Sequence, residues 1–306
     1  MVIGRQAIDE AAARVGGRVR CTPTIELEAG AFPGAGAVTL KLELMQHTGS
    51  FKPRGAFNRI LASTVPGAGV IAASGGNHGA AVAYAARELG HRAEIYVPET
   101  TPAFKLRRLE QYGAQVVATG ASYAPALLAS QARARETGAL VVHAYDQPEV
   151  LAGQGTLARE LEDQAPDLET VFVAVGGGGL IGGIAAWYAG RVRVIGVEPQ
   201  SCPTLYRALE AGRPVDVDVG GIAADSLGAR RIGDLAFAIA QRFVERVILV
   251  SDEDIVATQR LLWDRLRILA EPGGATALAG LLSEPCAGRV GVVVCGGNTD
   301  PARFAS

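Results

Sequence analysis

The sequence predicts an α/β protein made of two open, twisted sheets of parallel strands, with one lobe inserted in the other. Short apolar runs alternate with helical segments, glycine-rich turns follow several of those runs, and nearly half of the residues are hydrophobic while few are aromatic. Parallel strands need crossover helices, which cover both faces of the sheet and leave the strands as continuous apolar runs. A chain of 306 residues is also long enough for about two domains.

The first part of the chain leads to a single lysine between a strand and a helix. A helix over Gln6–Val15 is followed by CTPTIEL and by apolar residues that alternate from Val38 to Leu44, which predicts a strand. The segment TGSFKPRG comes next, with Lys52 directly before a proline. Proline suits the first helical position and disfavours helical backbone in the residue before it. We therefore expect a helix over Pro53–Leu61 with Lys52 at its N-terminal edge.

The surroundings of Lys52 favour a partly neutral amine. The positive end of a helix dipole disfavours an ammonium, and the nearby Phe51 and Phe57 disfavour it further. A neutral lysine is a nucleophile of the kind that forms Schiff bases. An ordinary solvated lysine beside a turn is the alternative, and this segment alone leaves both open.

A glycine-rich link, STVPGAG, marks the crossing into the inserted lobe. We expect a small domain over 65–147 inserted into a large domain formed by 1–64 and 148–306. Strands and helices alternate within the small domain, as in a parallel sheet with crossovers. Its expected elements are Val70–Ala73, Ala80–Leu89, Ala93–Val97, Pro102–Tyr112, Gln115–Ala118, Pro125–Glu136 and Leu140–His143.

The chain then returns to the large domain through HAYDQPEVLAGQGT. Apolar runs and helical patterns continue to alternate there, which extends the first sheet. The expected elements are a helix from Thr156, then Val171–Val175, Val192–Val197, Leu205–Leu209, Asp234–Phe243, Val247–Val250, Asp252–Leu269, Thr276–Leu282 and Val290–Val294.

The stretch VFVAVGGGGLIGG combines a strand, a glycine run and a helix. Glycines let backbone N–H groups approach an anion, and the N-terminus of the following helix adds positive charge, so the run predicts a phosphate cradle. Gly177, Gly179 and Gly182 also satisfy GxGxxG, and Glu198 follows about 20 residues later, as in dinucleotide-binding proteins. Taken alone, the run supports nicotinamide binding and another phosphate-bearing cofactor equally.

Two further turns follow apolar strands. SGGNHG, from Ser74 to Gly79, offers backbone donors, a hydroxyl and an amide, which suit a small carboxylate. His78 taken alone is more typical of a structural or capping residue than of a catalyst. The turn CGGN begins at Cys295, and a free cysteine is most often a small buried hydrophobe.

TGSFKPRG, SGGNHG, GGGGLIGG and CGGN occur in this order over nearly the whole chain. The set resembles the serine/threonine dehydratase branch of the fold-type-II pyridoxal-phosphate enzymes, which also holds serine racemase. The resemblance implies a tryptophan synthase β-like fold with the cofactor in the cleft between two domains. The nicotinamide interpretation explains only one motif and assigns no role to Lys52, so it ranks far below the pyridoxal-phosphate interpretation.

The resemblance also implies roles for individual residues. Lys52 would hold the cofactor as a Schiff base and would then act as the general base at Cα. The remaining cofactor contacts would be Phe51 against the ring, Asn77 on the ring hydroxyl, Gly176, Gly177, Gly178 and Gly179 on the phosphate, Cys295 at the pyridine nitrogen, and Glu271 nearby. The substrate would be bound by Ser50, Ser74, Gly75, Gly76, Asn77 and His78.

These roles imply a dehydratase, or ammonia-lyase. L-threonine, L-serine or a related 3-hydroxy amino acid would lose water and give a 2-oxo acid and ammonia. A thiol at Cys295 is a weak neutral donor, so the pyridine ring would be a poorer electron sink, which favours prompt loss of the β-hydroxyl.

Departures from the family pattern bear on the alternatives. Serine racemase needs an acid/base serine where this chain has Gly75, and its small-domain arginine falls on Ala126, so racemization is not expected as the main activity. A β-replacing synthase and a catalytically inert pyridoxal-phosphate carrier stay open as minor alternatives.

Relatives place a divalent cation near a glutamate, a carbonyl and an aspartate. Glu198 and Cys202 match the first two, but Thr204 replaces the aspartate, which weakens a Mg²⁺ or monovalent-cation site.

The composition argues against several classes of binding partner. A formal charge of −2 gives no electrostatic case for nucleic acid or an anionic membrane. No apolar run reaches transmembrane length, and the early acidic residues do not suit a signal peptide. The four cysteines lack disulfide-framework or zinc spacing. We therefore expect a cytoplasmic enzyme with a small amino-acid substrate, and the family habit implies a homodimer.

Overall fold

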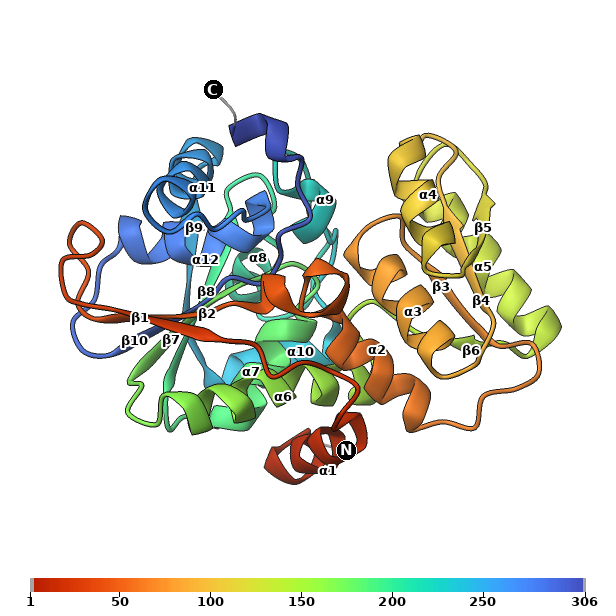
Figure 1. Cartoon of the computed structure of the whole chain (residues 1–306), viewed down its shortest axis with the longest axis horizontal. Helices are drawn as coiled ribbons and strands as arrows, with labels where there is room; N and C mark the ends of the chain where they lie inside the picture. The colour runs from red at the N-terminus through yellow and green to blue at the C-terminus, as the bar shows by residue number, and fades with distance from the viewer. Residues whose placement is uncertain (1–2, 305–306) are drawn as a thin grey trace.

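A computed structural model describes residues 3–304 and contains two sheets with helices packed on them. Figure 1 shows a larger and a smaller layered part side by side, with α2 and α9 on the side of the larger part that faces the smaller one. The larger sheet has the order β1-β2-β10-β7-β8-β9, and the smaller has the order β5-β4-β3-β6. The strands are β1 (Thr24–Leu27), β2 (Val38–Lys41), β3 (Val70–Ala73), β4 (Ala93–Val97), β5 (Gln115–Ala118), β6 (Leu140–Val141), β7 (Thr170–Ala174), β8 (Arg193–Pro199), β9 (Val244–Val250) and β10 (Val290–Val293).

Helices follow most strands, as crossover connections require. The α-helices are α1 (Arg5–Val15), α2 (Lys52–Leu61), α3 (Asn77–Glu88), α4 (Ala103–Gln111), α5 (Tyr123–Thr137), α6 (Pro148–Gln164), α7 (Gly179–Tyr188), α8 (Thr204–Ala211), α9 (Ala224–Leu227), α10 (Asp234–Phe243), α11 (Asp252–Leu266) and α12 (Pro272–Ser283). Short 3₁₀ helices are η1 (Glu43–Met45), η2 (His47–Gly49) and η3 (Pro301–Phe304). Within the described residues, no helix is long and apolar enough to cross a membrane.

The core of the larger part is a sheet covered on both faces. Every residue of β7 is buried, and so is every residue of β10. Helix α12 packs on β7, β8, β9 and β10, while α7 packs on β7 and β8 and is itself covered by α6 and α10. This burial explains why these strands are continuous apolar runs.

The smaller sheet has the same construction. Helix α5 packs on β3 and β4, and α3 packs on the same two strands. The chain leaves the larger part after α2 and returns to it at α6 (Figure 1). The domain boundaries expected from the sequence, 65–147 within 1–64 and 148–306, stay a prediction.

Three features differ from the expectations. Strand β1 lies antiparallel to β2 at the edge of an otherwise parallel sheet, and the sequence did not predict it. Helix α2 begins at Lys52, one residue before the expected start, with Phe51 as its N-cap. Strand β2 ends at Lys41, where the chain turns into η1 and not into a longer strand.

Two helices begin earlier than expected. Each contains a glycine ahead of its expected start, and that glycine allows a close contact with a neighbouring segment. Helix α6 starts at Pro148 and includes Gly153, where an added Cβ would lie 2.6 Å from the Arg54 carbonyl oxygen on α2. Helix α12 starts at Pro272 and includes Gly274, where an added Cβ would lie 2.0 Å from the Gly296 carbonyl oxygen. Interior glycines weaken a helix prediction, but here they let helix and neighbour approach each other.

The three glycine-rich turns follow β3, β7 and β10, all parallel strands. Turns after parallel strands gather at the carboxyl edge of a sheet, where α/β proteins bind ligands. A bridge between Ser50 and Gly296 then ties the segment before Lys52 to the turn after β10.

Candidate active site

Lys52 differs from the other two lysines of the chain. Lys41 forms a buried ion pair with Glu160, and Lys105 forms an ion pair with Asp225. The Lys52 ammonium instead donates to the Ala144 carbonyl oxygen at 2.8 Å. Burial lowers its pKa to about 8, although Cys295 and Glu271 oppose this shift. Lys52 is thus the lysine best placed to act as a neutral nucleophile or base.

The glycine turn after β7 forms a cradle of backbone donors. The N–H groups of Gly176, Gly177 and Gly178 meet no acceptor among the described residues, and α7 begins at Gly179. Gly178 has φ +92°, a conformation that favours glycine. An added Cβ at Gly177 would lie 2.2 Å from Cδ1 of Tyr145. The arrangement suits an anion such as a phosphate.

The segment after β6 connects Lys52 to this cradle. Ala144 accepts from Lys52, and the next residue, Tyr145, packs against Gly177. His143 Nδ1 accepts from the N–H groups of Tyr145 and Asp146 at 3.3 and 2.9 Å, which fixes the turn. Lysine and cradle therefore belong to one site.

The turn after β10 brings Cys295 beside Lys52. The thiol is 4% exposed and donates to the Gly273 carbonyl oxygen at 3.3 Å, and burial raises its pKa. Its carbonyl accepts from the Phe51 N–H at 3.1 Å. The Ser50 hydroxyl is buried and has no partner among the described residues. Cys295 is thus a neutral thiol, and Ser50 is a free donor.

The SGGNHG turn opens at the N-terminus of α3, with Gly76 as N-cap. The Ser74 hydroxyl accepts from the Gly76 N–H at 3.2 Å. The His78 ring does not point to a ligand, because its Nε2 donates to the Val142 carbonyl oxygen at 2.9 Å. Burial lowers the pKa of His78 to about 3. This histidine is a neutral structural residue, so any substrate contact would come from its backbone.

A chain of hydrogen bonds fixes the orientation of Asn77. Arg108 Nη2 donates to Asn298 Oδ1 at 2.8 Å, Asn298 Nδ2 donates to Asn77 Oδ1 at 2.6 Å, and Asn77 Nδ2 donates to Glu271 Oε1 at 2.6 Å. A guanidinium can only donate, so Asn298 must present its oxygen to Arg108. Each amide then has one possible orientation, and the Asn77 amide group points toward Glu271. Burial raises the pKa of Glu271 to about 7.

A cavity of about 900 Å³ opens beside these residues. Gly75, Gly76, Asn77 and Glu271 line it, together with residues of α4 and of the 222–226 segment. Its size suits a small organic ligand. The predicted substrate-binding turn thus faces an open cleft between the two sheets' helices.

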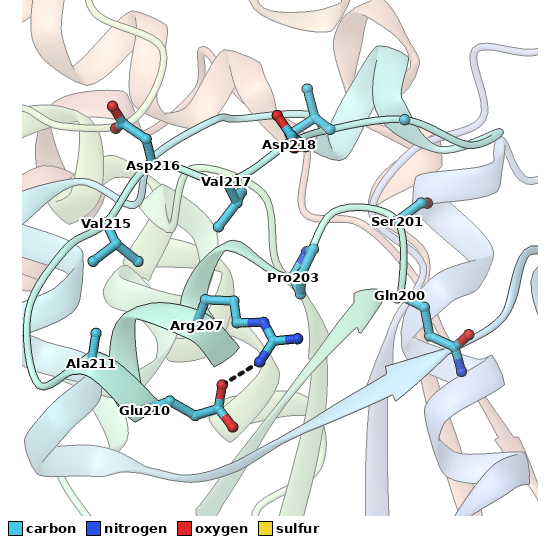
Figure 2. Close-up of a pocket in the computed structure, with 12 residues that line it drawn as sticks. Gln200, Ser201, Pro203, Arg207, Glu210, Ala211, Val215, Asp216, Val217 and Asp218 are labelled. Carbon is cyan, nitrogen blue, oxygen red and sulfur yellow. Dashed lines mark hydrogen bonds and ion pairs between the residues drawn. The ribbon is translucent and has the colours of Figure 1, made fainter.

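A second cavity, of about 860 Å³, lies elsewhere. Figure 2 shows that Gln200, Pro203 and the Arg207–Glu210 ion pair line it, and Asp216 lines it from another segment. None of the predicted cofactor-binding residues borders this cavity. It is a separate surface groove.

The predicted cation site finds no support in the geometry. Both carboxylate oxygens of Glu198 accept from backbone N–H groups, of Leu205 at 2.7 Å and Tyr206 at 2.9 Å. The Cys202 thiol donates to the Gly220 carbonyl oxygen. Among residues 3–304, no group of three or more His, Cys, Asp or Glu side chains could hold a metal ion. Glu198 is buried at the N-terminus of α8, away from solvent, and belongs to no such group of side chains. The cation site stays a prediction.

Of the predicted site residues, Gly75, Gly76, Asn77 and Glu271 line the 900 Å³ cleft, whereas Lys52, Cys295 and the glycine turn after β7 do not border it, and neither do Glu198 and Cys202. Sequence reasoning missed the roles of Tyr145, Arg108 and Asn298. Asn298 ends the CGGN motif, which was a signal, whereas nothing near Tyr145 or Arg108 in the sequence indicates their contacts.

Comparison with known proteins places the chain in a family. Residues 15–296 match the family described as pyridoxal-phosphate dependent enzyme, and the chain belongs to it. It is 40% identical to the biosynthetic L-threonine dehydratase of Pasteurella multocida, over 80% of this chain and 48% of the relative. Phenylserine dehydratase of Ralstonia pickettii is 38% identical, over 94% and 90%. The structure of maize serine racemase superimposes with a TM-score of 0.94 at 32% identity, covering 100% and 96%.

The family match confirms the predicted resemblance, the fold class and the cofactor, pyridoxal phosphate. The relatives named as dehydratases support the predicted class of activity, a pyridoxal-phosphate-dependent lyase. The chain spans about half the length of the P. multocida enzyme, so its substrates and partners are matters for proposal.

Proposed function

We propose that this protein is a pyridoxal-phosphate-dependent dehydratase that converts L-threonine, L-serine or a related 3-hydroxy amino acid to a 2-oxo acid and ammonia. One observation carries the proposal. Lys52 has a lowered pKa and lies beside Cys295. It donates to the Ala144 carbonyl oxygen, and the next residue, Tyr145, packs against Gly177 in the glycine turn. A nucleophilic amine next to an anion cradle is the arrangement that an aldehyde cofactor with a phosphate requires.

The residues present fit pyridoxal phosphate. The free N–H groups of Gly176, Gly177 and Gly178, with the N-terminus of α7, would hold the phosphate. Lys52 would bind the aldehyde carbon, Asn77 the ring hydroxyl and Cys295 the ring nitrogen, and Phe51 would pack against the ring. When bound, the cofactor supplies a conjugated ring that withdraws electrons from Cα.

The chain's own groups account for the rest of the reaction. Lys52, once released by the substrate amine, would take the Cα proton with its neutral Nζ. The Ser74–Asn77 turn would hold the substrate carboxylate with backbone N–H groups at the start of α3, and the free Ser50 hydroxyl would add a donor. Loss of the β-hydroxyl as water and later uptake of one water leave a 2-oxo acid and ammonium.

Gly75 favours dehydration over racemization. A racemase needs a second acid on the face of Cα opposite Lys52. Gly75 has no side chain, and an added Cβ there would lie 3.1 Å from Cγ2 of Thr101. This position therefore offers neither an acid nor easy room for one.

We also propose a homodimer in the cytoplasm. The dimer rests on the family resemblance alone. Cys21, Cys202, Cys286 and Cys295 are all free thiols, as is usual in a reducing compartment.

The test is turnover of the cofactor-loaded protein with L-threonine and L-serine, followed as 2-oxo acid and ammonia. Lys52→Ala should lower the rate by at least about 10³-fold, because both the covalent attachment and the base are lost. Circular dichroism of the variant would verify its fold. Full activity of Lys52→Ala, or no 2-oxo acid from wild type with either substrate or with any other 3-hydroxy amino acid, would refute the proposal.

A further inference from the structure

Two exposed apolar side chains, from separate segments of the chain, line the 900 Å³ cleft. Phe104, on α4, is 61% exposed, and Ile222, in the segment before α9, is 41% exposed. Single exposed hydrophobic side chains are ordinary on a protein surface, so what distinguishes this pair is its position on one cavity. Both line the same cavity as the SGGNHG turn.

The charged groups of the cleft leave little positive charge for a second substrate carboxylate. Lys105 pairs with Asp225 at 2.5 Å. Arg108 donates to the Thr48 carbonyl oxygen at 2.6 Å and to Asn298. Three carboxyl groups, those of Asp225, Glu271 and Asp300, line the same cavity. An anionic β-substituent would therefore meet like charges while both cations are already engaged.

We propose that the enzyme prefers 3-hydroxy amino acids whose β-carbon carries an apolar group of aryl size, held between Phe104 and Ile222. This inference rests on the proposed dehydratase function. The volume of the cleft exceeds what the methyl group of threonine needs, and an apolar group would cover the two exposed side chains. An aromatic ring could also pack against the Phe104 ring.

The experiment compares kcat/KM of the cofactor-loaded protein for three substrates. L-threo-3-phenylserine should give phenylpyruvate and ammonia with kcat/KM at least about tenfold above L-threonine, which is the discrimination that an apolar pocket supplies. L-threo-3-hydroxyaspartate should be the poorest of the three. A higher kcat/KM for L-threonine or for hydroxyaspartate than for phenylserine would overturn the preference while leaving the dehydratase function in place.

Variants of Phe104 and Ile222 test whether these two side chains bind the apolar group of the substrate. Phe104→Ala and Ile222→Ala should each lower the ratio of kcat/KM for phenylserine to kcat/KM for threonine by about fivefold to tenfold. Leu128→Ala, on α5, is the matched control, because Leu128 is 65% exposed and lies outside the cleft. It should leave the ratio unchanged. An unchanged ratio in Phe104→Ala and Ile222→Ala would refute the binding role of these two side chains. Failure of all three substrates and of L-serine would instead refute the proposed function itself.

Discussion

Single residues determine how the amide groups of this site are oriented. Arg108 can only donate hydrogen bonds, and that restriction passes through Asn298 to Asn77, the residue that we propose binds the cofactor ring hydroxyl. Arg108 touches none of the expected reacting atoms and is a positioning residue. A half-buried amide that could rotate freely would bind the ring less well.

Arg108→Met should weaken cofactor binding by about tenfold, since a hydrogen bond from a charged donor contributes about 1.5 kcal/mol or more. Titration of the cofactor-free protein, followed by visible absorption, measures this, and the band itself should shift. Arg108→Lys should recover part of the affinity, because an ammonium also only donates.

Arg107→Met is the control for this change, because Arg107 is the exposed neighbour on the same helix. Equal cofactor affinity and equal spectra for the Arg108→Met and Arg107→Met proteins would show that the hydrogen-bond chain does not position Asn77.

At the scale of elements, glycines set how closely turns and helices approach one another. The turn before α7 lies against Tyr145 so closely that any side chain at Gly177 would enter the ring. The same turn carries the free N–H groups that we propose hold the phosphate, so a change at Gly177 would affect both packing and binding.

Gly177→Ala should therefore lower cofactor affinity by at least about tenfold and destabilise the fold by about 1–3 kcal/mol, the usual cost of overpacking. Equilibrium titration and thermal unfolding measure the two effects. Gly67→Ala is the control, since nothing lies within 4 Å of an added Cβ there. Adding Tyr145→Ala to Gly177→Ala should recover part of the stability. Wild-type affinity in Gly177→Ala would contradict the assigned cradle.

The sequence predicted the elements that follow simple rules. Strands β3, β4, β5 and helix α10 have the expected bounds, because their apolar runs and flanking turns agree. Helices α6 and α12 were predicted too short, because Gly153 and Gly274 are read as breaks although they serve tertiary contacts.

The candidate site was predictable where a motif is continuous in sequence. Lys52, the glycine run and SGGNHG each carry a local physical reason. Arg108 and Tyr145 acquire their contacts only from the fold, and an arginine on an amphipathic helix has no signature that separates it from Arg107. The burial of Glu198 was likewise not evident at a strand end.

At the scale of the whole molecule, His78 connects α3 to the segment that returns to the larger part. Its folded pKa, about 3, is well below the usual value of 6.5. The unfolded chain therefore binds more protons between these values, and stability is lost as the pH falls below 6.5.

His78 should account for about 2 kcal/mol of lost stability between pH 7 and pH 5 in the cofactor-free protein. Denaturant unfolding of wild type and His78→Gln at both pH values measures this, and the variant should show the smaller change. Identical pH dependence in the two proteins, or a His78 ring that titrates near 6.5 by NMR, would contradict its buried neutral state.

We propose that Lys52, and neither of the other two lysines, binds the cofactor. Borohydride reduction of the loaded protein, followed by digestion and mass spectrometry, locates the attached pyridoxyl group directly. We expect Lys52 alone to carry this group, because Lys41 and Lys105 are held in ion pairs. A pyridoxyl group on Lys41 or Lys105, or a loaded protein with none on Lys52, would contradict it.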